Sequence, residues 1–464
     1  MQRRRRPVRA AAVGLVACLV PALVACSGRD DPDPSLSGSP SASSASPTEA
    51  GTVTLGVYGR EDELEAFEGV ADDYNASSLT GQVELEPWRD RAAAVQGVAD
   101  GDVPDVFMAS RQDLPGLMSR EAVRPVGELL DERGVDFGDD FSRDAVAAFG
   151  LDAQLQCMPY AVSPEVMFVN TELVDFERMA GRGLNVPQRE DFWNLAEFTA
   201  AAEFASRPAR GTRGTRGFYI EPTLHGLTPY IYSGGGQVYD DDDAPTSLTL
   251  SDGDTQDALE RSLAVLRDAQ LTLTDKQLVK ASPQDWFERG RLGMMAGSRD
   301  LVPRLRSLPG LAFDVWSMPV VDSPATVGGI TGLCMSAETE DPQAAADVIA
   351  ALVSDEAMAR VAAAGFMVPA NNSVANSEVF LQPLREPRQA ALFNNALRGM
   401  VVPPLIADRS ELEEAVGPLV EQLLTLPGEL DLEAVTEQID EASRPVLDPD
   451  YVPESPSPSL SPSD

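Results

Sequence analysis

Two apolar segments that lie far apart in the chain constrain its fold most strongly. Residues 154–170 predict a strand, a break at Pro159-Tyr160 and a second strand that ends at Asn170. Residues 327–336 form another apolar stretch, and we expect them to carry the chain back across the same boundary. Two crossings between two lobes make a hinge, and the space between hinged lobes suits a small ligand.

The residues before the first crossing predict an α/β lobe with a parallel sheet. Predicted strands alternate with predicted helices, at 53–57, 83–86 and 103–108 for the strands and at 61–75 and 91–99 for the helices. This alternation implies right-handed crossovers, and such sheets bind ligands at the carboxyl ends of their strands. The polar and aromatic residues at those ends are Tyr58, Arg60, Trp88, Ser110 and Arg111.

The two crossings divide the rest of the chain. The first lobe is predicted over residues 52–157 and again over 327–380, where the chain returns to it. The second lobe is predicted over 158–326, and the helices of 381–445 belong mostly to it. The predicted fold class is therefore α/β, with two lobes joined by a hinge.

The N-terminus predicts an export signal over residues 1–25. Arg3 to Arg6 and Arg9 are basic, residues 10–24 are apolar, and Leu23-Val24-Ala25 precedes Cys26. A basic start, a short apolar run and small residues before a cleavage site are typical of a secretory signal. The run is too short for a stable membrane span.

The residues around Cys26 resemble a bacterial lipobox. This resemblance implies that Cys26 becomes the first mature residue and carries lipid, which would hold the protein on the outer face of the cytoplasmic membrane. A plain signal peptide followed by Cys by chance is the alternative. Residues 26–51 and 446–464 are rich in Ser, Pro and Asp, and they predict a disordered tether and a disordered tail.

The net charge of the chain limits the kinds of partner that we expect. A formal net charge of -38 repels phosphates, so we expect no nucleic acid partner.

Once Cys18 leaves with the signal and Cys26 takes lipid, Cys157 and Cys334 remain, one in each crossing. Exported proteins keep disulfides, and we predict that these two pair. Two buried free thiols are the alternative.

The residue inventory argues against several kinds of active site. His225 is the only His, which excludes Ser-His-Asp, Cys-His and His-based zinc sites unless His225 itself serves. We interpret it as an ordinary hydrogen-bonding residue. Gly234 to Gly236 has no following Lys-Ser/Thr, which indicates a turn rather than a phosphate loop. The acidic run 240–243 lacks the spacing of a calcium loop. We expect no metal, cofactor or catalysis.

Five motifs occur in order within residues 52–445. They are Ala99-Asp-Gly-Asp-Val-Pro-Asp-Val-Phe107, Met158 to Asn170, Phe192-Trp-Asn-Leu-Ala-Glu-Phe198, Phe287 to Gly297, and Met318-Pro319 with Gly328-Gly329. Together they resemble the motifs of extracellular solute-binding proteins of ABC importers, in the carbohydrate-binding, maltose-binding-protein-like family. The resemblance implies a periplasmic-binding-protein-like fold, with two α/β lobes, a hinge and a ligand cleft.

The resemblance also implies which residues line that cleft. Carried over motif by motif, they are Tyr58, Arg60, Ser110, Arg111, Tyr160, Ser298, Arg299, Gly328, Gly329 and Thr331. Aromatic faces stack on sugar rings, so four further candidates are Trp88, Tyr232, Trp286 and Trp316. Core packing is the alternative for each Trp.

Three Arg depart from the family pattern, in which Trp or Asp is common at these places. Arg60, Arg111 and Arg299 could together clamp a carboxylate or a phosphate. Ion pairs with nearby acids on the surface are the alternative. A sugar is therefore the expected ligand by resemblance, and an anionic solute is the alternative.

The resemblance implies a monomeric substrate-binding lipoprotein that captures a sugar or oligosaccharide and delivers it to the membrane subunits of an ABC permease. A surface sensor or adaptor that keeps the same clamp is a second interpretation. A glycoside hydrolase is a third one, because acidic pairs are plentiful, although no spacing singles out a catalytic pair.

Overall fold

A computed structural model describes residues 51–78, 81–189, 192–207 and 214–452. The predicted signal, the lipidation site at Cys26 and most of the predicted tether and tail lie outside these residues. Two boundaries differ from expectation, since Gly51 already belongs to the first strand and the last helix extends to Leu447. Among the described residues, none of the helices is both long enough and apolar enough to cross a bilayer.

The first lobe is built on an eight-stranded sheet. Its main order is β13-β7-β12-β3-β1-β2, and β4 and β14 both pair with β12. Its strands are β1 (Gly51–Tyr58), β2 (Gly81–Trp88), β3 (Val106–Ser110), β4 (Val123–Arg124), β7 (Cys157–Pro164), β12 (Thr326–Ser336), β13 (Val368–Pro369) and β14 (Met400–Val401). β2, β1 and β3 are parallel, as the alternation predicts, and β12 runs antiparallel between β3 and β7.

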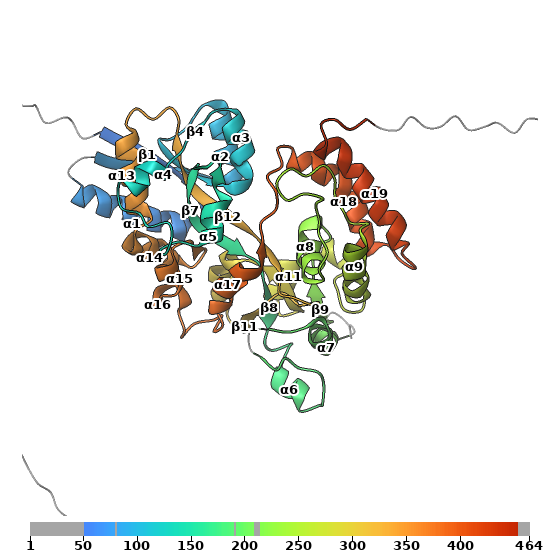
Figure 1. The fold of residues 1–464 in the computed structure, drawn as a ribbon. Helices are drawn as coiled ribbons and strands as arrows, with labels where there is room; N and C mark the ends of the chain where they lie inside the picture. The colour runs from blue at the N-terminus through green and yellow to red at the C-terminus, as the bar shows by residue number, and fades with distance from the viewer. Residues whose placement is uncertain (1–50, 79–80, 190–191, 208–213, 453–464) are drawn as a thin grey trace, which may run out of the picture. The chain divides into compact units, whose positions relative to one another are not determined.

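Helices pack on this sheet through regularly spaced apolar residues. They are α1 (Glu61–Ser77), α2 (Arg91–Asp100), α13 (Pro342–Leu352) and α14 (Asp355–Ala364), and Figure 1 shows α14 next to α1. The side chains of Asp341 and Ser354 accept from the main chain at the starts of α13 and α14. Gly365 ends α14 with φ 90°, a left-handed conformation that favours glycine. Shorter helices are α3 (Leu114–Ser119), α4 (Gly127–Asp131), α5 (Arg143–Ala148), α15 (Asn372–Ala375) and α16 (Glu378–Leu381).

The second lobe is built on a four-stranded sheet with the order β11-β8-β10-β9. Its strands are β8 (Val166–Asn170), β9 (Arg216–Tyr219), β10 (Leu292–Gly297) and β11 (Phe313–Trp316). Its helices are α6 (Phe176–Ala180), α7 (Leu195–Ala205), α8 (Leu224–Ser233), α9 (Gly253–Leu266), α10 (Asp275–Leu278), α11 (Pro283–Glu288), α12 (Val302–Arg306), α17 (Ala391–Ala396), α18 (Arg409–Thr425) and α19 (Leu432–Leu447).

The core of the second lobe explains why its C-terminal helices dock there. Leu412, Val416 and Val420 of α18 and Ile439 of α19 belong to the same buried cluster as Trp193. Figure 1 shows α18 and α19 side by side, and the buried carboxylate of Asp440 accepts from the main-chain N–H of Leu250 at 2.7 Å. The lobe is therefore completed by residues that follow the return crossing.

The chain passes from one sheet to the other at Glu165. β7 continues to Pro164 in the eight-stranded sheet and β8 begins at Val166 in the four-stranded sheet, so the crossing lies after the boundary expected at 157/158. The N–H of Glu165 donates to the carbonyl of Val327 at 2.8 Å, and the Thr326 hydroxyl donates to the carbonyl of Glu165 at 2.7 Å. The two crossings are thus bonded to each other.

The break expected at Pro159-Tyr160 is absent from β7. The strand runs through both residues, and the register against β12 shifts between Thr331 and Gly332 instead. Because Pro159 has no N–H to donate, the ladder accommodates it as a local irregularity rather than a strand end. A disulfide joins Cys157 to Cys334, the pair expected from the sequence, and these residues lie opposite each other on β7 and β12.

Candidate functional site

Two adjoining cavities lie where the ends of the second sheet meet the crossings. The first has a volume of about 310 Å³ and is lined by Glu165 at the crossing, by the segment from Tyr219 to Glu221, and by residues of α8, α11 and β10. The second has a volume of about 430 Å³ and lies between the first turns of α8 and α18. Glu221 and His225 line both cavities, so these two residues form the wall between them.

Residues of the first lobe complete the second cavity. Gln112 follows β3, Val327 is in β12, and Pro403 follows β14, while Tyr232 and Arg409 come from the second lobe. A solute held there would touch the return crossing as well as both lobes. This is the position that a hinged pair of lobes requires for a ligand that controls closure.

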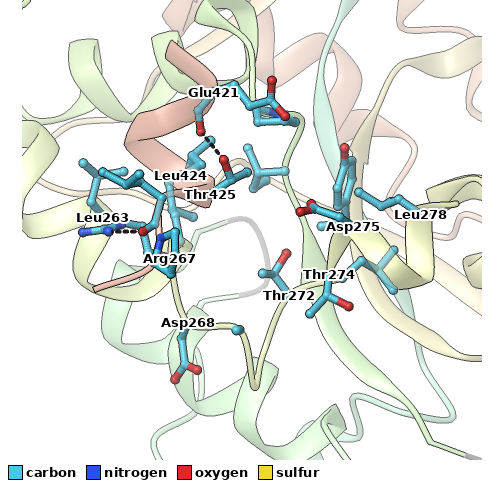
Figure 2. Close-up of a pocket in the computed structure, with 18 of the residues that line it drawn as sticks. Leu263, Arg267, Asp268, Thr272, Thr274, Asp275, Leu278, Glu421, Leu424 and Thr425 are labelled. Carbon is cyan, nitrogen blue, oxygen red and sulfur yellow. Dashed lines mark hydrogen bonds between the residues drawn. The ribbon is translucent and has the colours of Figure 1, made fainter. Parts of the chain in front are cut away.

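A third cavity, of about 700 Å³, lies within the second lobe. Figure 2 shows Leu263 and Arg267 of the α9 region on one side, Asp275 and Leu278 of α10 opposite, and Glu421 of α18 above the opening. Arg267 donates to the carbonyl of Leu426 at 2.6 Å, one of the interactions drawn in Figure 2. This cavity shares Tyr219 and Ile220 with the first one, but no residue of the crossings lines it.

The sole His forms a polar pair with the crossing. Nε2 of His225 lies 3.3 Å from Oε1 of Glu165, and both side chains are partly exposed to the cavities. Among the described residues, the carboxylate of Glu221 has no protein partner. Burial and the carboxylates of Glu221, Glu421 and Asp275 raise the pKa of Tyr219 to about 12, so its hydroxyl stays a hydrogen-bond donor.

A group of polar residues lies in the first lobe at the ends of β1 and β3. Tyr58 shares a hydrogen bond with Thr331, and burial followed by the nearby Asp113 raises its pKa to about 12. Arg91 and Asp113 form an ion pair of 2.6 Å. Burial raises the pKa of Glu63 to about 7, and the carboxylate of Asp300 from the second lobe adds to this shift. The structure thus brings together Tyr58 and Thr331, two of the residues that the family resemblance assigns to the cleft.

The tryptophans predicted as stacking candidates belong to packed cores. Trp286 is 7 % exposed, donates to the carbonyl of Gln277 at 3.3 Å and is covered by Arg291. Trp316 is also 7 % exposed and packs against Trp193. Trp88 is partly buried against the core of the first lobe. Trp286 and Trp316 therefore pack in cores, which is the alternative given for each Trp. Of the four further aromatic candidates, Tyr232 lines one of the two adjoining cavities.

None of the three Arg of the alternative anion clamp lines either of the two adjoining cavities. Arg299 is 0 % exposed, and its guanidinium donates to the carbonyls of Gly365 and Phe380 between the rings of Phe380 and Phe393. Arg111 donates to the carbonyls of Ala148 and Pro403. Arg60 is exposed beside Glu63. Main-chain oxygens therefore accept hydrogen bonds from two of the three guanidinium groups, while Nη1 of Arg299 is buried without a partner among the described residues.

The remaining predicted site residues lie in different surroundings, some in the core and some at the surface. Tyr160 is 0 % exposed and packs on Phe67 in the core of the first lobe, so it does not line a cavity. Ser110 begins the turn after β3, where Asp113 accepts from its N–H. Ser298 donates to Asp300 after β10. Gly328 lies against the main chain of Ser163, and Gly329 is exposed.

Apart from Tyr232, the residues that line the two adjoining cavities are not among the predicted site residues. Glu165 carried a signal, because it is the one acid within an apolar double strand. His225 was noticed but interpreted as unremarkable, while Glu221 and Arg409 had no local pattern that marks a site. Across the described ranges, no group of three or more His, Cys, Asp or Glu side chains could hold a metal ion.

The fold is that of a two-lobed α/β protein, and two adjoining cavities lie at its crossings. The family model of the bacterial extracellular solute-binding proteins matches residues 69–383. The chain therefore belongs to this family, whose members bind solutes rather than transform them. Comparison with curated proteins gave no match.

Solved structures agree on the fold. An ABC substrate-binding protein of Listeria monocytogenes in complex with cycloalternan aligns with a TM-score of 0.70 at 18 % identity, over 86 % of this chain and 99 % of that one. The GacH receptor of Streptomyces glaucescens, solved unliganded and with acarbose, aligns with a TM-score of 0.66 at 20 % identity, over 87 % and 100 %. A maltose complex of MalE from Listeria monocytogenes aligns with a TM-score of 0.70 at 13 % identity, over 88 % and 100 %.

Proposed function

We propose that this protein captures a saccharide in the two adjoining cavities and delivers it to the permease of an ABC importer. The observation that carries the proposal is the shared wall of Glu221 and His225, where His225 bonds Glu165 at the crossing. Carboxylates, an imidazole and tyrosine hydroxyls suit the many hydroxyl groups of a sugar. Binding there would favour the conformation in which both lobes contact the ligand.

Similar structures support the saccharide class, since their bound molecules are cycloalternan, acarbose and maltose. The cavity volumes of about 310 and 430 Å³ lie at the small end of the range for ligand sites, and together they suit an oligosaccharide. The occupied guanidinium groups of Arg111 and Arg299 count against the anionic alternative.

A thermal-shift panel tests the ligand class. It would compare neutral mono- and oligosaccharides with sugar acids, sugar phosphates and peptides. A ligand at a hundred times its dissociation constant adds about 2.7 kcal/mol to the free energy of unfolding, so we expect a raised Tm with a saccharide. A shift only with anions or peptides would contradict the proposal.

Delivery and anchoring need separate tests. We further propose that the protein acts as a monomer anchored by lipid on Cys26, so the variant Cys26→Ala should be released from the cell. Deleting the gene should abolish uptake of the saccharide that binds. Unchanged uptake would instead favour the interpretation as a surface sensor.

A further inference from the structure

Two guanidinium groups of the second lobe converge on the C-terminus of α14. Arg299, which follows β10, is 0 % exposed and donates through Nε to the carbonyl of Gly365 at 3.2 Å. Nη1 of Arg306, in α12, lies 3.8 Å from the position that a Cβ atom would take on Gly365. Both side chains therefore approach the same glycine.

Each of these guanidinium groups has a buried nitrogen without an acceptor. Within the described residues, Nη1 of Arg299 and Nη2 of Arg306 make no hydrogen bond, although neither atom is exposed to solvent. The other nitrogens of the pair donate to oxygens of Gly365, Phe380, Gln382 and Glu386. A buried donor without an acceptor is rare unless a ligand or water completes it.

The positive charge around this pair exceeds the negative charge beside it. Burial, followed by the guanidinium groups of Arg306 and Arg385, lowers the pKa of Arg299 to about 9. In the described part of the chain none of these three Arg forms a salt bridge, and the carboxylate of Glu386 acts on Arg306 without bonding it. The C-terminus of α14 adds only about half of a negative elementary charge. One carboxylate and a helix end do not balance three guanidinium groups.

Gln382 helps to hold this arrangement. Its φ of 43° is left-handed, a conformation that costs energy in a residue with a side chain. Its Nε2 donates to the carbonyls of Ala363 and Val379 at 3.3 and 3.1 Å, which directs Oε1 toward Arg306 and Arg385. The amide therefore fixes two guanidinium groups close together, against their mutual repulsion.

We propose that a monovalent inorganic anion of the size of chloride binds between Nη1 of Arg299 and Nη2 of Arg306. Such an anion accepts hydrogen bonds from both groups and also balances their charge, which a water molecule does not. Neither Arg lines any of the three cavities described above, so the occupant is small. The anion would link α12 to residues 365–386 as a structural component of the protein, separate from the solute.

Thermal unfolding of the purified protein without saccharide tests this proposal at pH 7. Gluconate, an anion too large for a buried site of this kind, is exchanged for chloride at constant sodium concentration and ionic strength, because salt alone screens the acidic surface. We expect the Tm to rise saturably, by at least about 2 °C at about 200 mM chloride, and bromide to act in the same way. Equal Tm values in chloride and gluconate would overturn the proposal.

Two variants of the same helix locate the effect. Arg306→Gln removes one of the two donors and its charge, and it should abolish the difference in Tm between chloride and gluconate. Arg304→Gln is the matched control, because Arg304 is exposed and pairs with Glu288, and it should keep that difference. A chloride effect that survives Arg306→Gln would overturn the assigned place of the anion.

Anomalous diffraction from crystals grown in sodium bromide locates the anion without any variant. We expect a peak within hydrogen-bonding distance of Nη1 of Arg299 and Nη2 of Arg306. Water at that position, without an anomalous peak, would overturn the proposal. Neither measurement uses a saccharide, so the failure of this proposal would leave the proposed function intact, and the failure of saccharide capture would leave the anion site intact.

Discussion

Cys157 and Cys334 face each other across β7 and β12, with their Cα atoms 4.3 Å apart and a disulfide between them. They are 177 residues apart in sequence, and the loop between them contains every strand of the second sheet. The bond therefore ties together the two strands that lead into and out of the second lobe. It lies in the core of the first lobe, away from the cavities.

Removal of this disulfide should destabilise the protein strongly. The loop-entropy model gives about 5 kcal/mol for a loop of this length, and we expect the double variant Cys157→Ala, Cys334→Ala to lose roughly 3–5 kcal/mol in urea unfolding. A reductant should destabilise the native protein similarly and should not affect the variant. Equal midpoints for the native protein and the variant would contradict a stabilising bond.

Arg299 should support structure rather than bind ligand. Its buried guanidinium bonds two main-chain carbonyls, and burial with the nearby Arg306 lowers its pKa to about 9. The variant Arg299→Met leaves both carbonyls without a donor, so we expect a loss of about 2–4 kcal/mol in the free energy of unfolding. Saccharide affinity, measured on folded protein, should change less than about twofold.

The exposed Arg289 provides a matched control for this variant. It pairs with Asp285 at 3.4 Å on the surface of the same lobe. The variant Arg289→Met should change stability by less than about 0.5 kcal/mol. A loss of affinity in Arg299→Met without a loss of stability would restore the clamp that the sequence suggested.

The stability of the protein should depend on pH through Glu63. Its pKa rises from an ordinary 4.5 to about 7, mainly by burial, so the folded state binds this proton more tightly than the unfolded state. The resulting stability is fully present below pH 4.5 and is lost as the pH rises through 7. Relative to the native protein, Glu63→Gln should therefore gain about 2 kcal/mol at pH 8, after solvent screening, and little at pH 4.5.

Denaturant unfolding of Glu63→Gln at both pH values checks this difference. Glu61→Gln, at an exposed carboxylate in the same turn of α1, is the matched control with which the gain is compared. An equal gain at both pH values would mean that burial of the Glu63 carboxylate is not its source.

Trp316 should contribute to stability because it packs in the core. It lies 4.8 Å from Phe176 and 5.4 Å from Trp193, measured between ring centroids. We expect Trp316→Ala to lose about 3–5 kcal/mol in the free energy of unfolding. Trp316→Phe should lose less. A variant that stays stable but no longer binds saccharide would contradict the placement in the core.

The fold was largely predictable because it depends on patterns of neighbouring residues. The strand and helix alternation, the capping residues Asp341 and Ser354 and the terminating Gly365 all act within a few residues. The position of the first crossing was predicted less accurately, since the sequence suggests a break at Pro159-Tyr160 and only the sheet partners distinguish β7 from β8. Glu165 marks the point where those partners change.

The site was less predictable because its walls come from distant segments. Glu221 and His225 precede or begin α8, whereas Arg409 begins α18, and only the packing of α18 on α8 brings them together. The site predictions for the aromatic and Arg residues were inaccurate for a physical reason. A Trp can pack in a core as well as line a cleft, and a buried Arg can donate to carbonyl oxygens as well as to a ligand.

We propose above that the solute binds at the wall formed by Glu165, Glu221 and His225. Calorimetric titration of the native protein and of the double variant Glu165→Gln, Glu221→Gln, with the tightest-binding saccharide of the panel, tests it most directly. We predict saturable binding by the native protein and an affinity at least about a hundredfold lower in the double variant, with the Tm of the free protein unchanged. Unchanged affinity in the double variant would contradict the account.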